Sequence, residues 1–131
     1  MGIERDYLVR QIMMLIEFIR RIAGFREKAQ NDAARREIKN FYKLLNLEES
    51  VLNKNIRELT DYLINERKLT NDHLEIIAFV MKEQGEMITN KQVQEDLFRK
   101  AYLLLAKVDR ESITFSMERK IKMGELKEYL I

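Results

Sequence analysis

Apolar residues between Ile3 and Ala23 recur at the spacing of an α-helix and cover most of its circumference. One row along this helix consists of Leu8, Ile12, Leu15, Ile19 and Ile22. That row is flanked on one side by Val9, Met13, Ile16 and Ala23, and on the other by Tyr7, Met14 and Phe18. The strip left to face water holds Asp6, Arg10, Glu17, Arg20 and Arg21. A helix this apolar needs cover from several directions. We therefore expect it to be either the central helix of a bundle or one half of an interface between chains.

The same spacing predicts further helices along the rest of the chain. Asn31 or Asp32 is expected to cap a second helix that runs to about Leu45, after a segment 25–30 that forms a short helix or a turn. Residues 47–53 are expected to be a connector. The later helices begin at residues whose side chains cap helices, namely Asn55 (with Glu58 at capping-box spacing), Thr70, Asn90 and Asp109. The last of them carries an apolar side made of Ile113, Met117, Ile121, Leu126 and Leu130.

The helix predicted over residues 70–88 is also apolar on more than one side. Beyond its main stripe it carries Ile76, Phe79 and Val80, which indicates a second central helix. Gly85 lies inside it, where glycine costs about 1 kcal/mol relative to alanine. We take this glycine to indicate the close approach of another helix.

These elements predict an all-α fold in a single domain, residues 1–131, with five to six antiparallel helices. Proline is absent, so nothing in the composition interrupts helix propagation. Short connections favour antiparallel neighbours. The pattern leaves two arrangements open, a compact bundle and a short tetratricopeptide-like array.

The two helices predicted at 70–88 and 90–108 can be compared with a tetratricopeptide repeat, a helix-turn-helix unit of about 34 residues. With Gly85 as the small residue of the first helix, Ile88 takes the following aromatic position, and Leu97, Ala101 and Leu104 fall where the repeat has small, aromatic and small residues. Asp109 then takes the place of the terminal proline. The spacing fits but the residue sizes do not, so two ordinary packed helices explain the pattern at least as well.

Over most of its length the chain resembles an uncharacterised family of small helical proteins from Gram-positive bacteria. The stretches that carry the resemblance are Arg5-Asp6-Tyr7-Leu8-Val9-Arg10-Gln11-Ile12, Lys82-Glu83-Gln84-Gly85-Glu86, Leu97-Phe98-Arg99-Lys100-Ala101 and Phe115-Ser116-Met117-Glu118. The resemblance implies a helical, somewhat repeat-like fold and a bacterial cytoplasmic protein. It implies no activity, and these motifs hold packing residues.

Catalytic and metal-binding chemistry has little support in the sequence. There is no cysteine and no glycine-rich phosphate loop, and the lone histidine, His73, is interpreted as a partly exposed surface group. The acidic pairs Glu48/Glu49, Glu83/Glu86 and Glu95/Asp96 lie near lysines, which favours solvated charge over a metal site. We therefore expect no enzymatic activity and no cofactor. The lack of cysteine suits a reducing compartment, and charges within the first apolar run argue against a membrane span. A cytoplasmic location is the expectation.

Two surfaces are candidates for binding. The first is apolar: we predict that the chain dimerises with itself or docks a protein partner through Tyr7, Val9, Met13, Met14 and Phe18. Methionine side chains adapt to irregular partners, which favours such a role. The alternative is anion binding, to nucleic acid or an anionic surface, through Arg20, Arg21, Arg35, Arg36, Lys39 and Lys43. Acidic residues lie among these bases and the formal net charge is only +2, so nucleic acid is the weaker candidate.

Overall fold

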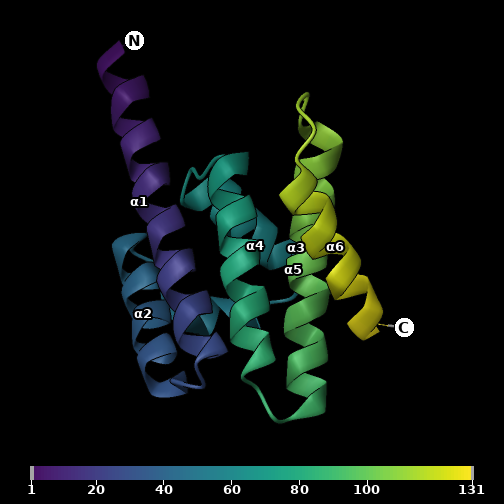
Figure 1. Ribbon diagram of the computed structural model, residues 1–131. Helices are drawn as coiled ribbons and strands as arrows, with labels where there is room; N and C mark the ends of the chain where they lie inside the picture. Colours follow the sequence, from purple (N-terminus) through teal and green to yellow (C-terminus); the bar gives the residue numbers. More distant parts are fainter. Residues whose placement is uncertain (1, 131) are drawn as a thin grey trace.

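The computed structural model describes residues 2–130, with side chains from residue 5 onward. Within these residues the fold is all-α, as predicted, and the arrangement is a compact bundle (Figure 1). Its six α-helices are α1 (Gly2–Glu27), α2 (Asn31–Leu44), α3 (Ile56–Asp61), α4 (Asn71–Glu86), α5 (Lys91–Glu111) and α6 (Met117–Leu130). A short 3-10 helix, η1 (Glu49–Asn53), lies in the predicted connector, and a π-helical turn, η2 (Tyr62–Glu66), continues α3.

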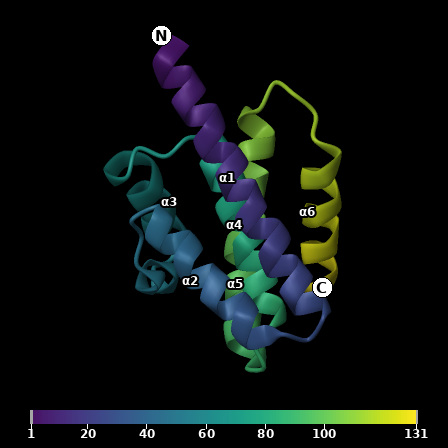
Figure 2. The ribbon, with the colours of Figure 1, turned by 60° about the vertical axis from the view of Figure 1, so that its left-hand side comes forward.

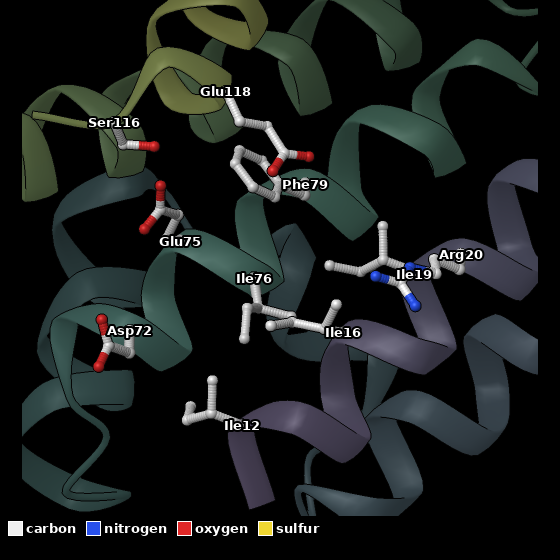
Figure 3. A pocket seen from close by; sticks show the side chains of 10 residues that line it. All are labelled: Ile12, Ile16, Ile19, Arg20, Asp72, Glu75, Ile76, Phe79, Ser116 and Glu118. Atoms are coloured by element: carbon white, nitrogen blue, oxygen red, sulfur yellow. The ribbon is translucent and has the colours of Figure 1, made fainter. Parts of the chain in front are cut away.

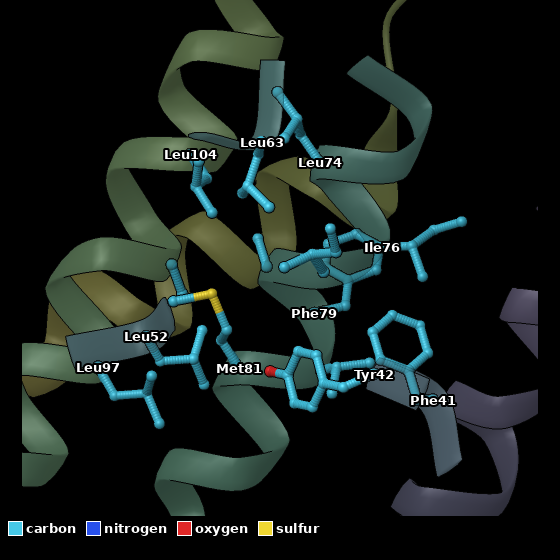
Figure 4. Close-up of a cluster of buried hydrophobic side chains, with 14 of the residues drawn as sticks. Phe41, Tyr42, Leu52, Leu63, Leu74, Ile76, Phe79, Met81, Leu97 and Leu104 are labelled. Atoms are coloured by element: carbon cyan, nitrogen blue, oxygen red, sulfur yellow. The ribbon is translucent and has the colours of Figure 1, made fainter. Parts of the chain in front are cut away.

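Helix α4 is the central element of the bundle. It packs against α1, α2, α5 and α6, and Figure 2 shows α2 and α6 on opposite sides of the molecule. Eight consecutive residues, Ile76 to Glu83, are buried, so neighbouring helices surround α4 at this level, least completely at Ile76 and Phe79, which are 5% and 7% exposed. The apolar core extends from α4 to Phe41 and Tyr42 of α2 and to Leu104 of α5 (Figure 4). The prediction that this helix is central is confirmed.

Local sequence signals explain where three of the six described helices begin. The side chain of Asn55 accepts a hydrogen bond from the backbone N–H of Glu58 at 2.8 Å, and Asn90 caps α5 through the N–H of Val93 at 3.1 Å. These caps satisfy backbone donors that the first helical turn leaves free. Thr70 caps α4 in the same way. The caps predicted at these three positions are confirmed. The cap predicted at Asn31 or Asp32 is wrong, because α2 begins at Asn31 and the residue before it, Gln30, makes no side-chain capping hydrogen bond.

The predicted start of the last helix is wrong. Asp109 lies inside α5, which continues to Glu111, and α6 begins at Met117. No proline or glycine lies between Val108 and Met117, so the helix continues past its last apolar residue. Three apolar residues assigned to the buried side of this helix are exposed instead, namely Ile113, Met117 and Ile121.

Gly85 marks a close contact between α4 and α5, as predicted. A Cβ atom at this position would lie 2.5 Å from Cε1 of Phe98, whose ring is fully buried. The carbonyl of Gly85 also accepts a hydrogen bond from the side chain of Gln94 at 2.9 Å. The absence of a side chain at Gly85 therefore lets the ring of Phe98 on α5 pack directly against the backbone of α4.

Candidate helix-docking groove

The bundle does not enclose its first helix. The N-terminal half of α1 extends past the end of α2 in both views (Figures 1 and 2). Leu15 and Ile22 are fully buried, whereas Leu8, in the same apolar row, is 41% exposed. A large apolar surface on this helix is thus left facing solvent.

The five residues predicted to form an interface lie on two flanks of α1. Val9 and Met13, which are 50% and 61% exposed, lie on the flank that also carries Ile16. Tyr7 and Met14 are exposed on the opposite flank. Phe18 shares that second flank but is half-buried. Its ring packs edge-on against Phe41 of α2, with 6.2 Å between centroids, and the guanidinium of Arg21 lies 4.6 Å above it.

A groove runs between α1 and the start of α6, over the surface of α4. Its volume is about 410 Å³, and its lining consists of Ile12, Ile16, Ile19, Arg20, Asp72, Glu75, Ile76, Phe79, Ser116 and Glu118. Figure 3 shows the isoleucines of α1 facing Ile76 of α4, with the polar residues of α4 and α6 along the other side. Ile76 and Phe79 form the floor, and Ile16, at 38% exposed, forms part of the mouth. The groove thus has an apolar interior open to solvent.

The floor of this groove was missed by sequence reasoning, although a signal for it was present. Ile76 and Phe79 widen the apolar surface of α4 beyond one stripe. That excess predicts a central helix and does not by itself say which part of its surface neighbouring helices cover. The partial cover at this point follows from the separation of α1 and α6, which is a tertiary property.

One edge of the groove is acidic. Asp72 and Glu118 are exposed and have no ion pair among residues 5–130. Glu75 is paired with Arg119 at 3.3 Å. Burial raises the pKa of Glu75, and the nearby Arg119 guanidinium offsets part of that increase. On the α1 edge, Arg20 pairs with Glu17 at 2.7 Å. The edge made by α4 and α6 therefore carries the uncompensated negative charge.

Arg119 fixes the α6 wall of the groove. Its side chain is nearly completely buried. The guanidinium donates to Asp109 of α5 at 3.0 Å, to Glu75 of α4 at 3.3 Å and to the carbonyl of Thr114 at 3.1 Å. One side chain thus joins α4, α5, α6 and the connection before α6. Glu75 and Arg119 are 44 positions apart in the sequence, so no local sequence pattern predicts this contact.

His73 fixes the α1 wall, and its predicted exposure is wrong. It is 4% exposed, and its Nδ1 accepts a hydrogen bond from the backbone N–H of Thr70 at 3.2 Å. Its Nε2 lies 2.9 Å from Oε1 of Gln11 on α1. Since Nδ1 acts as the acceptor, Nε2 carries the proton and donates to Gln11. The histidine completes the capping box of α4 and connects that cap to α1.

We expect acid to destabilise the protein through His73. Burial lowers the pKa of His73 below its ordinary 6.5, and the charge of Asp72 opposes this only in part. Protonation would place a hydrogen on Nδ1, facing the Thr70 N–H. The unfolded chain therefore binds more protons than the folded chain just below pH 6.5. This contribution to stability is complete above that pH, and it is lost as the pH falls through the lower folded-state pKa.

The measurement is urea unfolding at about pH 7.5 and pH 5.5, on either side of the ordinary histidine pKa. The matched variant is His73→Gln, because glutamine keeps an acceptor for the Thr70 N–H in a capping box. The wild type should lose more stability on acidification than the variant does. Equal losses would show that His73 does not control the pH dependence.

Half of the residues predicted to bind anions are ion-paired within the chain. Arg20, Arg21 and Arg35 are paired with Glu17, Glu37 and Asp32 at 2.7, 3.1 and 3.2 Å. Arg20 lies at the edge of the groove, whereas Arg21 faces α2. The remaining members, Arg36, Lys39 and Lys43, lie exposed on α2. Anion binding by the full set stays a prediction.

A second polar cluster joins the C-terminal parts of α1, α4 and α6. Lys82, which is buried, binds Glu86 at 3.0 Å and Glu125 at 2.8 Å, and Arg26 binds Glu83 and Glu86. The interpretation of Glu83 and Glu86 as solvated charges is wrong for Glu83, which is 4% exposed. These contacts are ion pairs that hold helices together, although Oε2 of Glu86 is buried and accepts no hydrogen bond from residues 5–130. Among the described residues, no group of three or more acidic or histidine side chains is placed to hold a metal ion.

Among residues 2–130, no helix combines the length and the apolar character that crossing a membrane requires. The chain matches no protein-family model, and no curated protein or solved structure is significantly similar to it. The resemblance to a family from Gram-positive bacteria therefore stays a prediction, as does the cytoplasmic location.

Proposed function

We propose that this chain is a non-enzymatic protein-interaction module whose groove between α1 and α6 docks an amphipathic helix of a protein partner. The observation that carries the proposal is the solvent-open apolar groove whose floor is Ile76 and Phe79. The other buried apolar residues of α4 are at most 1% exposed, whereas these two retain 5% and 7%. The floor is therefore the part of the central helix that the bundle covers least.

The dimensions of the groove suit a helical ligand. Its α1 wall extends from Ile12 to Ile19, which is about 10 Å along the axis. Side chains at positions i, i+3 or i+4, and i+7 of a helix cover the same length. A helix lying along the mouth can place such side chains in the groove while its backbone stays outside.

The charges at the edge indicate which helices fit best. Asp72 and Glu118 lie on the α4 and α6 side without ion-pair partners among residues 5–130. A ligand helix with lysine or arginine beside its apolar stripe would place positive charge against them. Such complementarity contributes mainly to specificity and association rate. We therefore expect a basic amphipathic helix to bind better than an acidic one.

The test is a methyl NMR titration of isoleucine-labelled protein. The probes are two synthetic peptides with the same leucine stripe at helical spacing, one with lysine and one with glutamate at its polar positions. We expect saturable shifts at Ile12, Ile16, Ile19 and Ile76 with the lysine peptide, and at least about tenfold weaker binding of the glutamate peptide. Absence of shifts at these methyls, or equal binding of both peptides, would contradict the proposal.

A matched pair of variants separates groove binding from adhesion to any apolar surface. Ile16→Glu places a charge at the mouth of the groove, whereas Ile121→Glu changes an isoleucine of α6 that is outside the lining and 53% exposed. Both positions are partly solvated, so both variants should fold. Only Ile16→Glu should abolish the methyl shifts caused by the lysine peptide. Binding that survives Ile16→Glu would place the site elsewhere.

A further inference from the structure

The outward face of α1 carries charges in an order that is complementary to itself. Asp6, Arg10, Glu17 and Arg21 are all exposed, and their sequence of signs is negative, positive, negative, positive. Arg20, the remaining charge of this strip, lies at the edge of the groove and is paired with Glu17. Met13 and Met14 lie at the middle of this series and are 61% and 51% exposed. The order of signs reverses when the helix is read from the other end, so the helix has a preferred orientation against a copy of itself.

We propose that two copies of this chain associate through the outward faces of their α1 helices, which pack antiparallel about a two-fold axis between Met13 and Met14. Around that axis Arg10 of each copy faces Glu17 of the other, because both lie about 5 Å along the helix from the midpoint. Asp6 likewise faces Arg21, at about 11 Å from the midpoint. A parallel pair would place Arg10 against Arg10 and Glu17 against Glu17, and these like charges repel.

The immediate surroundings favour a second copy as the occupant. Among residues 5–130, the guanidinium of Arg10 makes a single long hydrogen bond, 3.4 Å, to the carbonyl of Asp6 in its own helix. Glu17 is paired with Arg20, but both side chains are more than half exposed, so their contact is weak. Arg21 contacts Glu37 of α2 at 3.1 Å, but its side chain is 47% exposed, so Asp6 of the other copy can reach it as well. The charges that the dimer needs are therefore accessible.

Apolar contacts would add to these ion pairs. Val9 flanks the charged series on one side and Tyr7 flanks it on the other, and both are at least half exposed. The N-terminal half of α1 extends past α2, which leaves room for a second bundle beside it (Figure 1). Helix pairs pack at 8–10 Å between axes, so the methionines at the midpoint would be buried. This interface does not require the groove to be occupied.

The test measures the self-association constant by sedimentation velocity over a range of concentrations. Arg10→Glu and Glu17→Arg each replace two attractive pairs per dimer with two repulsive ones. We expect each single variant to weaken the dimer roughly tenfold or more. The double variant, with both changes in one chain, restores opposite charges across the axis. It should return the constant to within about threefold of the wild type.

The double variant also excludes an effect within one helix. It places a glutamate at position 10 near Asp6, and an arginine at position 17 near Arg20 and Arg21, so repulsion inside α1 increases while the pairing across the axis is restored. Circular dichroism should show that every variant remains helical. A wild type that is monomeric at all concentrations overturns the proposal, as does a double variant no tighter than the single ones.

The outcome is independent of the groove. None of these substitutions changes a residue that lines the groove, so the lysine peptide should still bind each variant. A monomeric protein that binds the peptide would contradict only the proposal of a dimer. A dimeric protein that does not bind the peptide would contradict only the proposal that the groove docks a helix.

Discussion

Gly85→Ala is expected to lower the free energy of unfolding by about 2–3 kcal/mol. The added methyl would lie 2.5 Å from Cε1 and 2.9 Å from Cδ1 of Phe98. That ring is fully buried, and on α6 the ring of Tyr129 lies 4.5 Å from it between centroids. Phe98 has little room to move away, so α4 and α5 must separate. Alanine gains about 1 kcal/mol of helix propensity over glycine, and the steric cost exceeds this gain.

The controls for this prediction are the glycines of two other helices. Gly24 in α1 and Gly124 in α6 have no heavy atom within 4 Å of an added Cβ. Gly24→Ala and Gly124→Ala should therefore stabilise the protein by up to about 1 kcal/mol each. Urea unfolding followed by circular dichroism measures all three variants. If Gly85→Ala behaved like the two controls, the close approach of the helices would not limit stability.

Arg119→Met is expected to cost about 3 kcal/mol, as is usual when one partner of a buried ion pair is removed. Methionine fills a similar volume but leaves the carboxylate of Glu75 without its partner and the carbonyl of Thr114 without its donor. Without the arginine, burial raises the pKa of Glu75 further. The folded variant then binds more protons than the unfolded chain. Its deficit relative to the wild type should shrink as the pH falls from 7 toward about 4.5, the ordinary pKa of the glutamate.

Two companion variants separate the buried network from ordinary surface charge. Glu75→Gln combined with Arg119→Met removes the stranded charge, and it should recover part of the loss and most of its pH dependence. Lys120 is the second cation bound to Asp109, and its side chain is 48% exposed. Lys120→Met should therefore change stability little. Urea unfolding at several pH values measures the series. A deficit for Arg119→Met that does not change with pH would contradict the role given to Glu75.

Features that depend on neighbouring residues could be predicted from the sequence. The caps at Asn55, Thr70 and Asn90 involve a side chain and an N–H three residues away. Gly85 is predictable for a related reason, because glycine inside a strongly apolar helix has few explanations other than close packing. The all-α class follows from periodicity along the whole chain.

Features that depend on the relative placement of helices could not be predicted. His73 is unusual as the third residue of a capping box, and the partner that explains its burial, Gln11, is 62 residues away. Ile113 and Met117 fit a helical stripe and are nevertheless exposed, because α5 and its connection end outside the core. The groove has the same origin, since its walls come from α1 and α6 and nothing local sets their separation.

The attachment of α6 has a mechanical consequence for the groove that it borders. Of its apolar side chains only Leu126 is fully buried, while Tyr129 packs against Phe98 and Met123 and Leu130 are partly buried. Its other anchors are ionic, through Arg119 and through Glu125 to Lys82. A segment with less apolar burial than the core helices is expected to detach at a lower free energy than they do. Detachment of α6 would open one wall of the groove while α4 and α5 stay folded, so side chains too large for the closed groove could enter it without unfolding the bundle.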